Sequence, residues 1–189
     1  MNDRNMHRIF LDTNITWNLD TFSEEIYDNV SVDENSVIAR IGRRGLEDLR
    51  ALRGITAVTG HYGSIEFVTA PTTILELEKK AHDDRGIRRM HWGFELLDWW
   101  LNEITINHPE EDFKQYEGLA QQLFNSHTLD FLPDSEDRLL ILAAVASNCG
   151  VFLTMDYKSI WNLKNKIEHI VPRLILRLSE YWSYVEKLL

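Results

Sequence analysis

The chain has 189 residues, of which 44% are hydrophobic and 11% are aromatic, and its formal net charge is −10 at pH 7. This length and this apolar content predict one domain with a substantial buried core. The single cysteine, Cys149, excludes a disulfide framework and a thiolate zinc site, and it suits a reducing compartment. A polar N-terminus and the absence of a long apolar run predict a cytoplasmic protein with no signal peptide and no membrane span.

The charge is unevenly distributed along the chain. Residues 36–92 carry ten lysines and arginines against seven acids, whereas residues 93–134 carry one against nine. The net charge argues against a nucleic-acid partner, but a local positive face attracts a polyanion whatever the total charge is. The basic residues are therefore candidates for phosphate contacts, and the alternative is that they are solvated or pair with Glu47, Asp48, Asp83 and Asp84. The candidates are Arg40, Arg43, Arg44, Arg50, Arg53, Lys79, Lys80, Arg85, Arg88 and Arg89.

The first third of the chain predicts a strand, a loop and a helix. Residues 9–11 form a short apolar run typical of a buried strand, and helix-start residues follow from Thr13. Residues 20–36 lack a clear period and are predicted as a loop with at most one helical turn. A helix is then predicted over residues 36–53, kinked around Gly42 and Gly45 and ended by Gly54. Residues 55–58 and 65–70 are predicted as a hairpin-like pair of strands.

The remainder predicts alternating helices and strands. Pro71 and the two threonines after it begin a helix, and further helices are predicted over 88–104 and 110–124 with aromatic residues at core spacing. An apolar helix from Ser135 leads into a strand at 151–155. A second strand is predicted at 167–171, followed by a final amphipathic helix whose apolar residues recur from Leu174 to Leu188.

Four acids are the candidates for a functional site. Asp12 and Asp156 each follow a predicted strand, Asp137 lies at the start of the apolar helix, and Glu76 lies in the first turns of the helix after Pro71. Each has a structural explanation taken singly, as a helix cap, a capping-box acid or a partner of the helix dipole. In an open α/β sheet, however, strand ends and helix starts share one edge, where four carboxylates repel unless a cation intervenes. Such a set of oxygens suits Mg²⁺ or Mn²⁺.

The same positions carry a resemblance to a known family. Asp-Thr-Asn at 12–14, Thr-Thr-Ile-Leu-Glu-Leu at 72–77, Glu-Asp at 136–137 and Leu-Thr-Met-Asp at 153–156 follow one another in the order found in PIN-domain nucleases. Asp137 and Asp156 are nineteen positions apart, which matches the family's spacing to its closing motif. The resemblance covers most of the chain as an order of elements, and the motifs at its two ends carry its specificity.

The resemblance implies a fold and an activity. The fold is α/β, a Rossmann-like three-layer PIN fold with a mostly parallel central sheet, helices on both faces and an added helical segment. It forms one domain over residues 1–189, with 20–64 and 88–124 as family-variable elaborations. The implied activity is a Mg²⁺- or Mn²⁺-dependent endoribonuclease that uses a metal-activated water. The metal-binding and catalytic acids are Asp12, Glu76, Asp137 and Asp156, and Asn14 and Thr154 orient them by hydrogen bonds.

Several alternatives stay open at this point. Glu78 competes with Glu76, and Glu136 competes with Asp137, because each pair lies at the same helix start. The chain is longer than the compact toxin ribonucleases of toxin–antitoxin pairs, which leaves open an inhibitor protein or a second copy of the chain as partner. A catalytically silent PIN-like module that binds RNA or protein is the alternative function, and a DNA nuclease is a third possibility.

Overall fold

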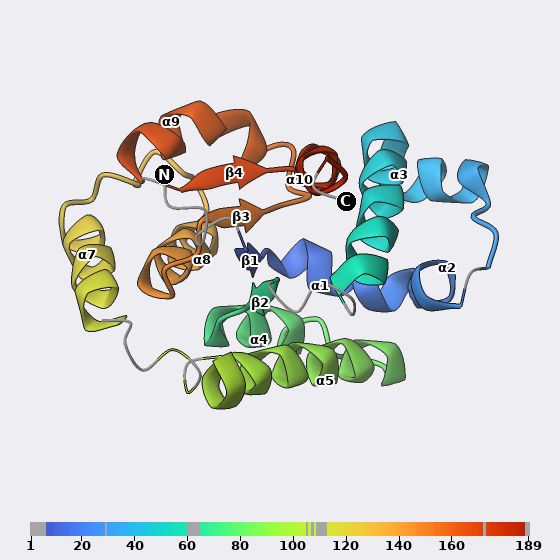
Figure 1. Cartoon of the computed structure of the whole chain (residues 1–189), viewed down its shortest axis with the longest axis horizontal. Helices are drawn as coiled ribbons and strands as arrows, with labels where there is room; N and C mark the ends of the chain where they lie inside the picture. The colour runs from blue at the N-terminus through green and yellow to red at the C-terminus, as the bar shows by residue number, and fades with distance from the viewer. Residues whose placement is uncertain are drawn as a thin grey trace.

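The chain forms an α/β structure around one parallel sheet. The four strands are β1 (Arg8–Leu11), β2 (Glu66–Val68), β3 (Val151–Leu153) and β4 (Leu174–Leu176), in the order β2-β1-β3-β4. All three strand pairings are parallel, and helices flank both faces of the sheet (Figure 1). The predicted α/β architecture with three layers is confirmed. The computed structural model describes residues 7–28, 30–59, 65–104, 106, 108, 113–171 and 173–187.

The strands are apolar throughout because both faces of the sheet are covered. Successive side chains in a strand point to opposite faces, so Ile9 and Leu11 join one core cluster and Phe10 joins the other. Phe10 stacks on Phe152 of the adjacent strand, with 5.3 Å between the ring centroids. The two clusters on the two faces fix the strands from both sides.

Each face has its own set of helices, and Figure 1 shows the two sets on the left and right of the sheet. One core cluster is completed by α7 (Phe113–Asn125), α8 (Ser135–Ala146) and α9 (Lys164–Ile170). The other is completed by α1 (Thr13–Thr21), α2 (Ser23–Tyr27), α3 (Glu34–Thr59) and α10 (Leu178–Val185).

The edge of the sheet at β2 is covered by a helical pair. α4 (Pro71–Glu78) follows β2 directly, and α5 (Asp84–Trp99) runs along its outer side, at the bottom of Figure 1. Two short elements complete the described chain, the π-helix η2 (Trp100–Ile104) and the 3₁₀ turn η3 (Trp161–Leu163). Within the described residues, no helix is both long and apolar enough to cross a bilayer.

The order of the strands creates a switch point between β1 and β3. The chain leaves β1 toward β2 on one side, and it later returns to β3 on the other side of β1. In open α/β sheets a crevice opens at such a point, outside the carboxyl ends of the strands. The residues that follow β1 and β3 therefore lie at the place where such folds hold their ligands.

The prediction for residues 54–58 was wrong. α3 does not end at Gly54 but continues to Thr59, and Ile55 is fully buried within the helix. A Cβ added at Gly54 would lie 2.8 Å from the ring of Trp182, so this glycine allows α10 to pack closely on α3. The predicted kink is present at Gly42, whose φ of 76° only glycine adopts readily. Residues 60–64 of the predicted hairpin lie outside the described residues.

Two further assignments were also wrong. Residues 20–36, predicted as a loop with at most one helical turn, do contain one short helix, α2, but they also contain the end of α1 and the start of α3 at Glu34. The predicted strand at 167–171 belongs to α9, where Ile167 is fully buried. The edge strand is instead β4, so the final helix begins at Leu178 rather than near Leu174. Short apolar runs fit a strand or one face of a helix equally well, which is why periodicity did not separate them.

Candidate active site

The four candidate acids come from four different elements and interact with one another. Asp12 follows β1, Asp156 follows β3, Asp137 lies in the first turn of α8, and Glu76 lies in α4. The charges of the other three carboxylates all raise the pKa of Asp12, so the four groups lie within the range of direct charge interactions. We call Asp12, Glu76, Asp137 and Asp156 the acidic cluster.

Asp12 is the buried centre of the acidic cluster. Its side chain is 2% exposed, and Thr154 Oγ1 donates a hydrogen bond of 2.6 Å to Asp12 Oδ2. Burial is the main cause that raises the pKa of Asp12 to about 7, and the Thr154 hydroxyl opposes this rise. Although Asp12 occupies the position before α1, its side chain makes no capping hydrogen bond. Helix capping therefore does not explain why an aspartate stands there.

Helix capping also fails to explain two of the other acids, although Asp137 does lie in the first turn of α8, where the helix dipole favours a carboxylate. The N-cap of α8 is Asp134, whose carboxylate accepts the amide hydrogen of Glu136, so Asp137 is not the cap. The residue before α4 is Ala70, and no side chain caps this helix, so Glu76 does not form the capping box that its spacing to Thr73 suggested. Asp137 and Glu76 thus make no hydrogen bond that the start of their helix requires.

Asp156 does have a local structural role. Its Oδ1 accepts the amide hydrogens of Lys158 and Ser159, both at 2.9 Å, and so holds the turn after β3. Its own amide donates to Thr154 Oγ1 at 2.8 Å, and the same hydroxyl donates to Asp12. Thr154 therefore couples the ends of β1 and β3, which is the orienting role predicted for it.

Ser159 is a member of the site that the sequence did not indicate. Its hydroxyl lies between two carboxylates of the acidic cluster, with hydrogen bonds to Asp137 Oδ2 at 3.0 Å and to Asp156 Oδ2. Burial raises the pKa of Asp137 to about 6, the nearby carboxylates add to the rise, and the Ser159 hydroxyl opposes it. A serine three residues after a strand-end aspartate is common in turns, so the sequence carried no specific signal for it.

Glu76 contributes an oxygen that lacks a hydrogen bond. Within the described residues, Glu76 Oε1 is buried and has no partner of normal hydrogen-bond geometry, and the same holds for Thr13 Oγ1. Burial raises the pKa of Glu76, the neighbouring Thr13 hydroxyl lowers it, and the charge of Glu136 raises it again. A buried carboxylate oxygen without a donor is costly unless a proton or a cation reaches it.

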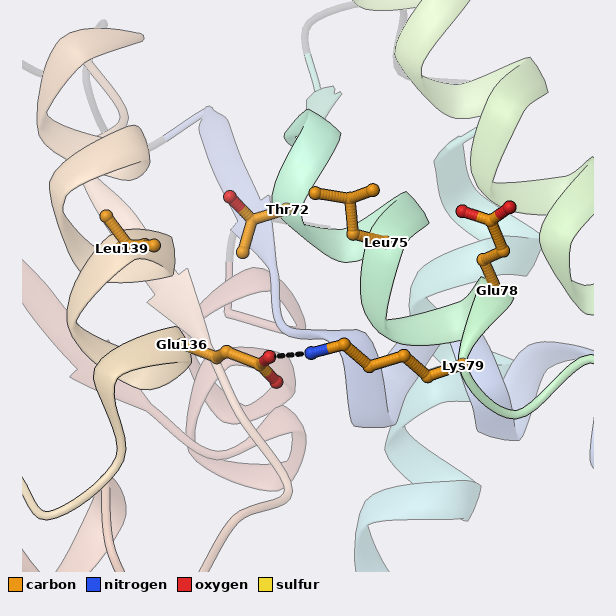
Figure 2. A pocket seen from close by; sticks show the side chains of 6 residues that line it. All are labelled: Thr72, Leu75, Glu78, Lys79, Glu136 and Leu139. Atoms are coloured by element: carbon orange, nitrogen blue, oxygen red, sulfur yellow. Dashed lines mark hydrogen bonds and ion pairs between the residues drawn. The ribbon is translucent and has the colours of Figure 1, made fainter.

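The two competing glutamates face a different region. Glu78 and Glu136 line a pocket of about 330 Å³ between α4 and α8, together with Thr72, Leu75, Lys79 and Leu139 (Figure 2). Lys79 Nζ forms an ion pair with Glu136 there and joins the end of α4 to the start of α8. Lys79, a predicted phosphate contact, and Glu136, the alternative to Asp137, thus bind each other.

Asn14 lies at the margin of the acidic cluster. Its side chain is exposed, and its Nδ2 lies 3.4 Å from Asp12 Oδ2, which is a weak hydrogen bond. Asn14 O accepts a hydrogen bond of 2.9 Å from Asn18 Nδ2, which keeps the first turns of α1 together. The hydrogen bond from Asn14 to Asp12 is therefore weaker than the one from Thr154.

Several of the basic residues predicted to contact phosphate are bound to acids. The arginines at 85, 88 and 89 all surround the buried carboxylate of Asp20, with Nε–oxygen distances of 3.5, 3.7 and 3.0 Å. Arg89 also stacks on Trp17, 3.5 Å from the ring centroid. Arg50 pairs with Glu34. Asp20 was not among the partners considered for these arginines, since it is far from them in the sequence.

Other basic residues predicted to contact phosphate are not paired with an acid in the described part of the chain. Among the described residues, Arg40, Arg43, Arg44 and Lys80 form no ion pair with a carboxylate, and all four are exposed. Arg40 lies over the ring of Phe22, Arg44 over Trp161, and Lys80 over Trp17, at 5.4 Å in each case. These contacts orient the side chains without neutralising them.

The acidic cluster has the type of ligand atom that a hard cation prefers, but its side chains are not arranged as a metal site. Carboxylate oxygens are what Mg²⁺ and Mn²⁺ prefer, and Glu76 Oε1 is a buried oxygen without a donor. In the part of the chain that the structure describes, however, no three histidine, cysteine or acidic side chains are already arranged to hold a metal ion. The Ser159 hydroxyl lies between Asp137 and Asp156, so these carboxylates would have to release it to share an ion.

Comparisons with known proteins add no assignment. A scan of protein-family models and searches of curated proteins and of solved structures found no match for the chain. A function therefore has to be inferred from the chemistry of the acidic cluster and its surroundings.

Proposed function

We propose that the protein is a Mg²⁺- or Mn²⁺-dependent endoribonuclease that hydrolyses phosphodiester bonds at the acidic cluster. The observation that supports this most is the convergence of four carboxylates, from four elements, around the buried Asp12 at the switch point of the sheet. Three of them make no capping hydrogen bond, so helix capping does not account for their presence. Clustered acids with raised pKa values mark sites of binding or chemistry.

The residues present fit a divalent cation by the type of their donors. The ligands would be Asp12, Glu76, Asp137 and Asp156. One oxygen of Asp156, Oδ1, already accepts two amide hydrogens from the turn after β3. When bound, such a cation supplies positive charge that makes water a better nucleophile and stabilises the charge that develops on a phosphate. It would also relieve the repulsion that raises the pKa values of Asp12 and Asp137.

The protein's own residues have separate tasks in this proposal. Thr154 fixes the rotation of the Asp12 carboxylate by donating to one of its oxygens, so the other oxygen is left to bind. The Ser159 hydroxyl lies within hydrogen-bond reach of Asp137 and Asp156 and donates its single proton to one of them at a time, which keeps the two carboxylates near each other. Asp12, nearly excluded from water, holds a proton near neutral pH when no cation is present. In this proposal the substrate is RNA and the protein acts in the cytoplasm. Neither an inhibitor protein nor a second copy of the chain is required.

A cleavage assay with matched variants tests this function. Purified protein is incubated with single-stranded RNA, and separately with single-stranded DNA, in Mg²⁺, in Mn²⁺ and in EDTA. We expect metal-dependent cleavage of RNA that Asp12→Asn and Asp137→Asn each abolish, because each removes an anionic ligand. Glu78→Gln is the control, since it removes a carboxylate from the same helix as Glu76 at an exposed position.

The possible results separate the candidates. Loss of cleavage in both aspartate variants with normal cleavage by Glu78→Gln supports the proposal. Cleavage of DNA but not RNA contradicts the substrate class. Absence of cleavage by the wild type in either metal overturns the proposal, and RNA binding without turnover would then indicate a catalytically silent binding module.

A further inference from the structure

A groove runs beside the acidic cluster between α1 and α3. Its volume is about 520 Å³, and Asn14 and Asp156 are among the residues that line it. The groove is therefore continuous with the acidic cluster, and a ligand that occupies it reaches the carboxylates directly. We call it the α1–α3 groove, and its remaining lining residues are Trp17, Asn18, Thr21, Phe22, Arg40, Ile41, Met155, Tyr157 and Lys158.

The α1–α3 groove carries two cations whose charge is not neutralised. Arg40 and Lys158 line its walls from α3 and from the turn after β3, and both side chains are exposed. Within the described residues, neither forms an ion pair with a carboxylate, in contrast to the three arginines that surround Asp20. Positive charge thus lines the same groove as Asp156 of the acidic cluster, which is the arrangement a polyanion needs if its backbone is to approach that cluster.

The positions of both cations are fixed by their surroundings. The guanidinium of Arg40 lies over the ring of Phe22, which is itself almost fully buried, so Arg40 is supported from below. The amide of Lys158 donates to Asp156 Oδ1, so Lys158 follows directly from a member of the acidic cluster. Its ammonium group therefore stays within one side-chain length of the carboxylates.

The remaining walls are mixed in character and narrow. Trp17 is half-buried and is held in place by the Arg89 guanidinium that stacks on it. Asn18 donates to the carbonyl of Asn14 and to the sulfur of Met155, so the floor of the groove is rigid. The volume of the groove lies in the range of small-ligand pockets (about 300–1,000 Å³), which is enough for a short stretch of a single strand.

We infer that the α1–α3 groove binds a single-stranded segment of the RNA substrate, with Arg40 and Lys158 contacting the phosphates next to the bond that is cut. This rests on the proposed function and adds the substrate class, an unpaired strand, and the groove that holds it. Single-strand sites combine a basic track with aromatic and apolar walls, and the α1–α3 groove has both. Lys158 was not indicated by the sequence, whereas the predicted contacts Arg85, Arg88 and Arg89 all surround Asp20.

Binding measured without turnover tests the inference. Fluorescence anisotropy of a labelled single-stranded RNA is followed in EDTA, so that no metal-dependent cleavage interferes, over a series of salt concentrations. Arg40→Gln and Lys158→Gln are each expected to raise Kd and to reduce the slope of log Kd against log salt by about 0.7, the value for one lost phosphate contact on a single strand. Lys114→Gln is the control, since it removes one exposed positive charge from α7 on the opposite face of the sheet.

Two comparisons make the result decisive. A duplex of the same sequence is expected to bind more weakly than the single strand, and circular dichroism melts confirm that the variants are folded. An unchanged Kd and salt slope in both groove variants, an equal loss in Lys114→Gln, or a duplex that binds as tightly as the single strand would overturn the inference. RNA binding that depends on Arg40 and Lys158 in a protein that never cleaves would instead contradict the proposed function and leave the groove assignment standing.

Discussion

Replacement of Asp12 by asparagine is expected to make the metal-free protein more stable at alkaline pH. The substitution keeps the shape of the side chain and an oxygen that can accept the Thr154 hydrogen bond, but it removes the ionisable group. The pKa of Asp12 rises from 3.8 to about 7 on folding, mainly because the carboxyl is buried. The folded protein therefore binds this proton more tightly than the unfolded chain does.

The sign and size of the effect follow from this difference. Since the folded state holds more protons between about pH 4 and pH 7, the free energy of unfolding of the wild type falls as the pH rises through that window. A shift of about 3 units corresponds to about 4 kcal/mol once the pH exceeds 7. Any water that reaches the acidic cluster screens the charge, which makes this figure an upper bound. In a chain of this size, 1 kcal/mol is worth about 2–4 °C in Tm, so Asp12→Asn gains at most about 8–16 °C.

Thermal and urea unfolding of the two proteins in EDTA measures the effect. The difference in stability should be small near pH 4.5 and should grow in favour of Asp12→Asn up to about pH 8. Mg²⁺ or Mn²⁺ should then stabilise the wild type and leave the variant unchanged, because a ligand that binds only the folded state raises its stability. A difference independent of pH, or a variant less stable than the wild type at pH 8, would refute the reasoning that Asp12 is an uncompensated buried carboxylate.

Three further substitutions have defined outcomes. Ser159→Ala removes a hydrogen bond to the Asp137 carboxylate, so the pKa of Asp137 should rise above about 6 in a carbon-13 NMR titration, and an unchanged value would contradict the observed contact. Asp48→Ala removes the fully buried acid that pairs with Arg177 and leaves it, among the described residues, only the exposed Glu47, so chemical denaturation should show a loss of about 3–5 kcal/mol, and a loss near zero would count against this buried pair. Gly54→Ala should lower the urea midpoint, with a cost of about 1–3 kcal/mol from overpacking against α10, whereas a gain would show that helix propensity dominates.

The parts of the fold that the sequence predicted correctly are those set by local pattern. Short apolar runs before Asp12 and Asp156 predicted β1 and β3. The two aspartates stood out as site candidates because an apolar strand has no solvation reason to end on a carboxylate. The long apolar helix from Ser135 was also predicted correctly. The elements that were missed, at 55–58 and at 167–171, are short apolar runs whose period does not separate a strand from a helix.

Long-range packing decided those cases. Residues 55–58 continue α3, where Ile55 is fully buried and the neighbouring Gly54 packs against Trp182 of α10, more than a hundred residues away in the chain. The edge strand falls at β4 because Leu174–Leu176 pairs in register with β3, whereas Ile167 is needed in the core beneath α9. Neither partner can be read from the sequence near these positions.

The sequence by itself determined which residues could form an anionic site, because the order of strands and acids brings strand ends to one edge of a parallel sheet. Only the tertiary structure decided which of the charged residues are free to act. It showed that Asp134 rather than Asp137 caps α8, and that Asp20 binds Arg89, 69 residues away in the chain. It also placed Ser159 between two carboxylates and left Arg40 and Lys158 unpaired beside them within the described residues. The reason is physical: backbone pattern is encoded locally, whereas the partner of a charge is set by whatever folding brings within a few ångströms of it.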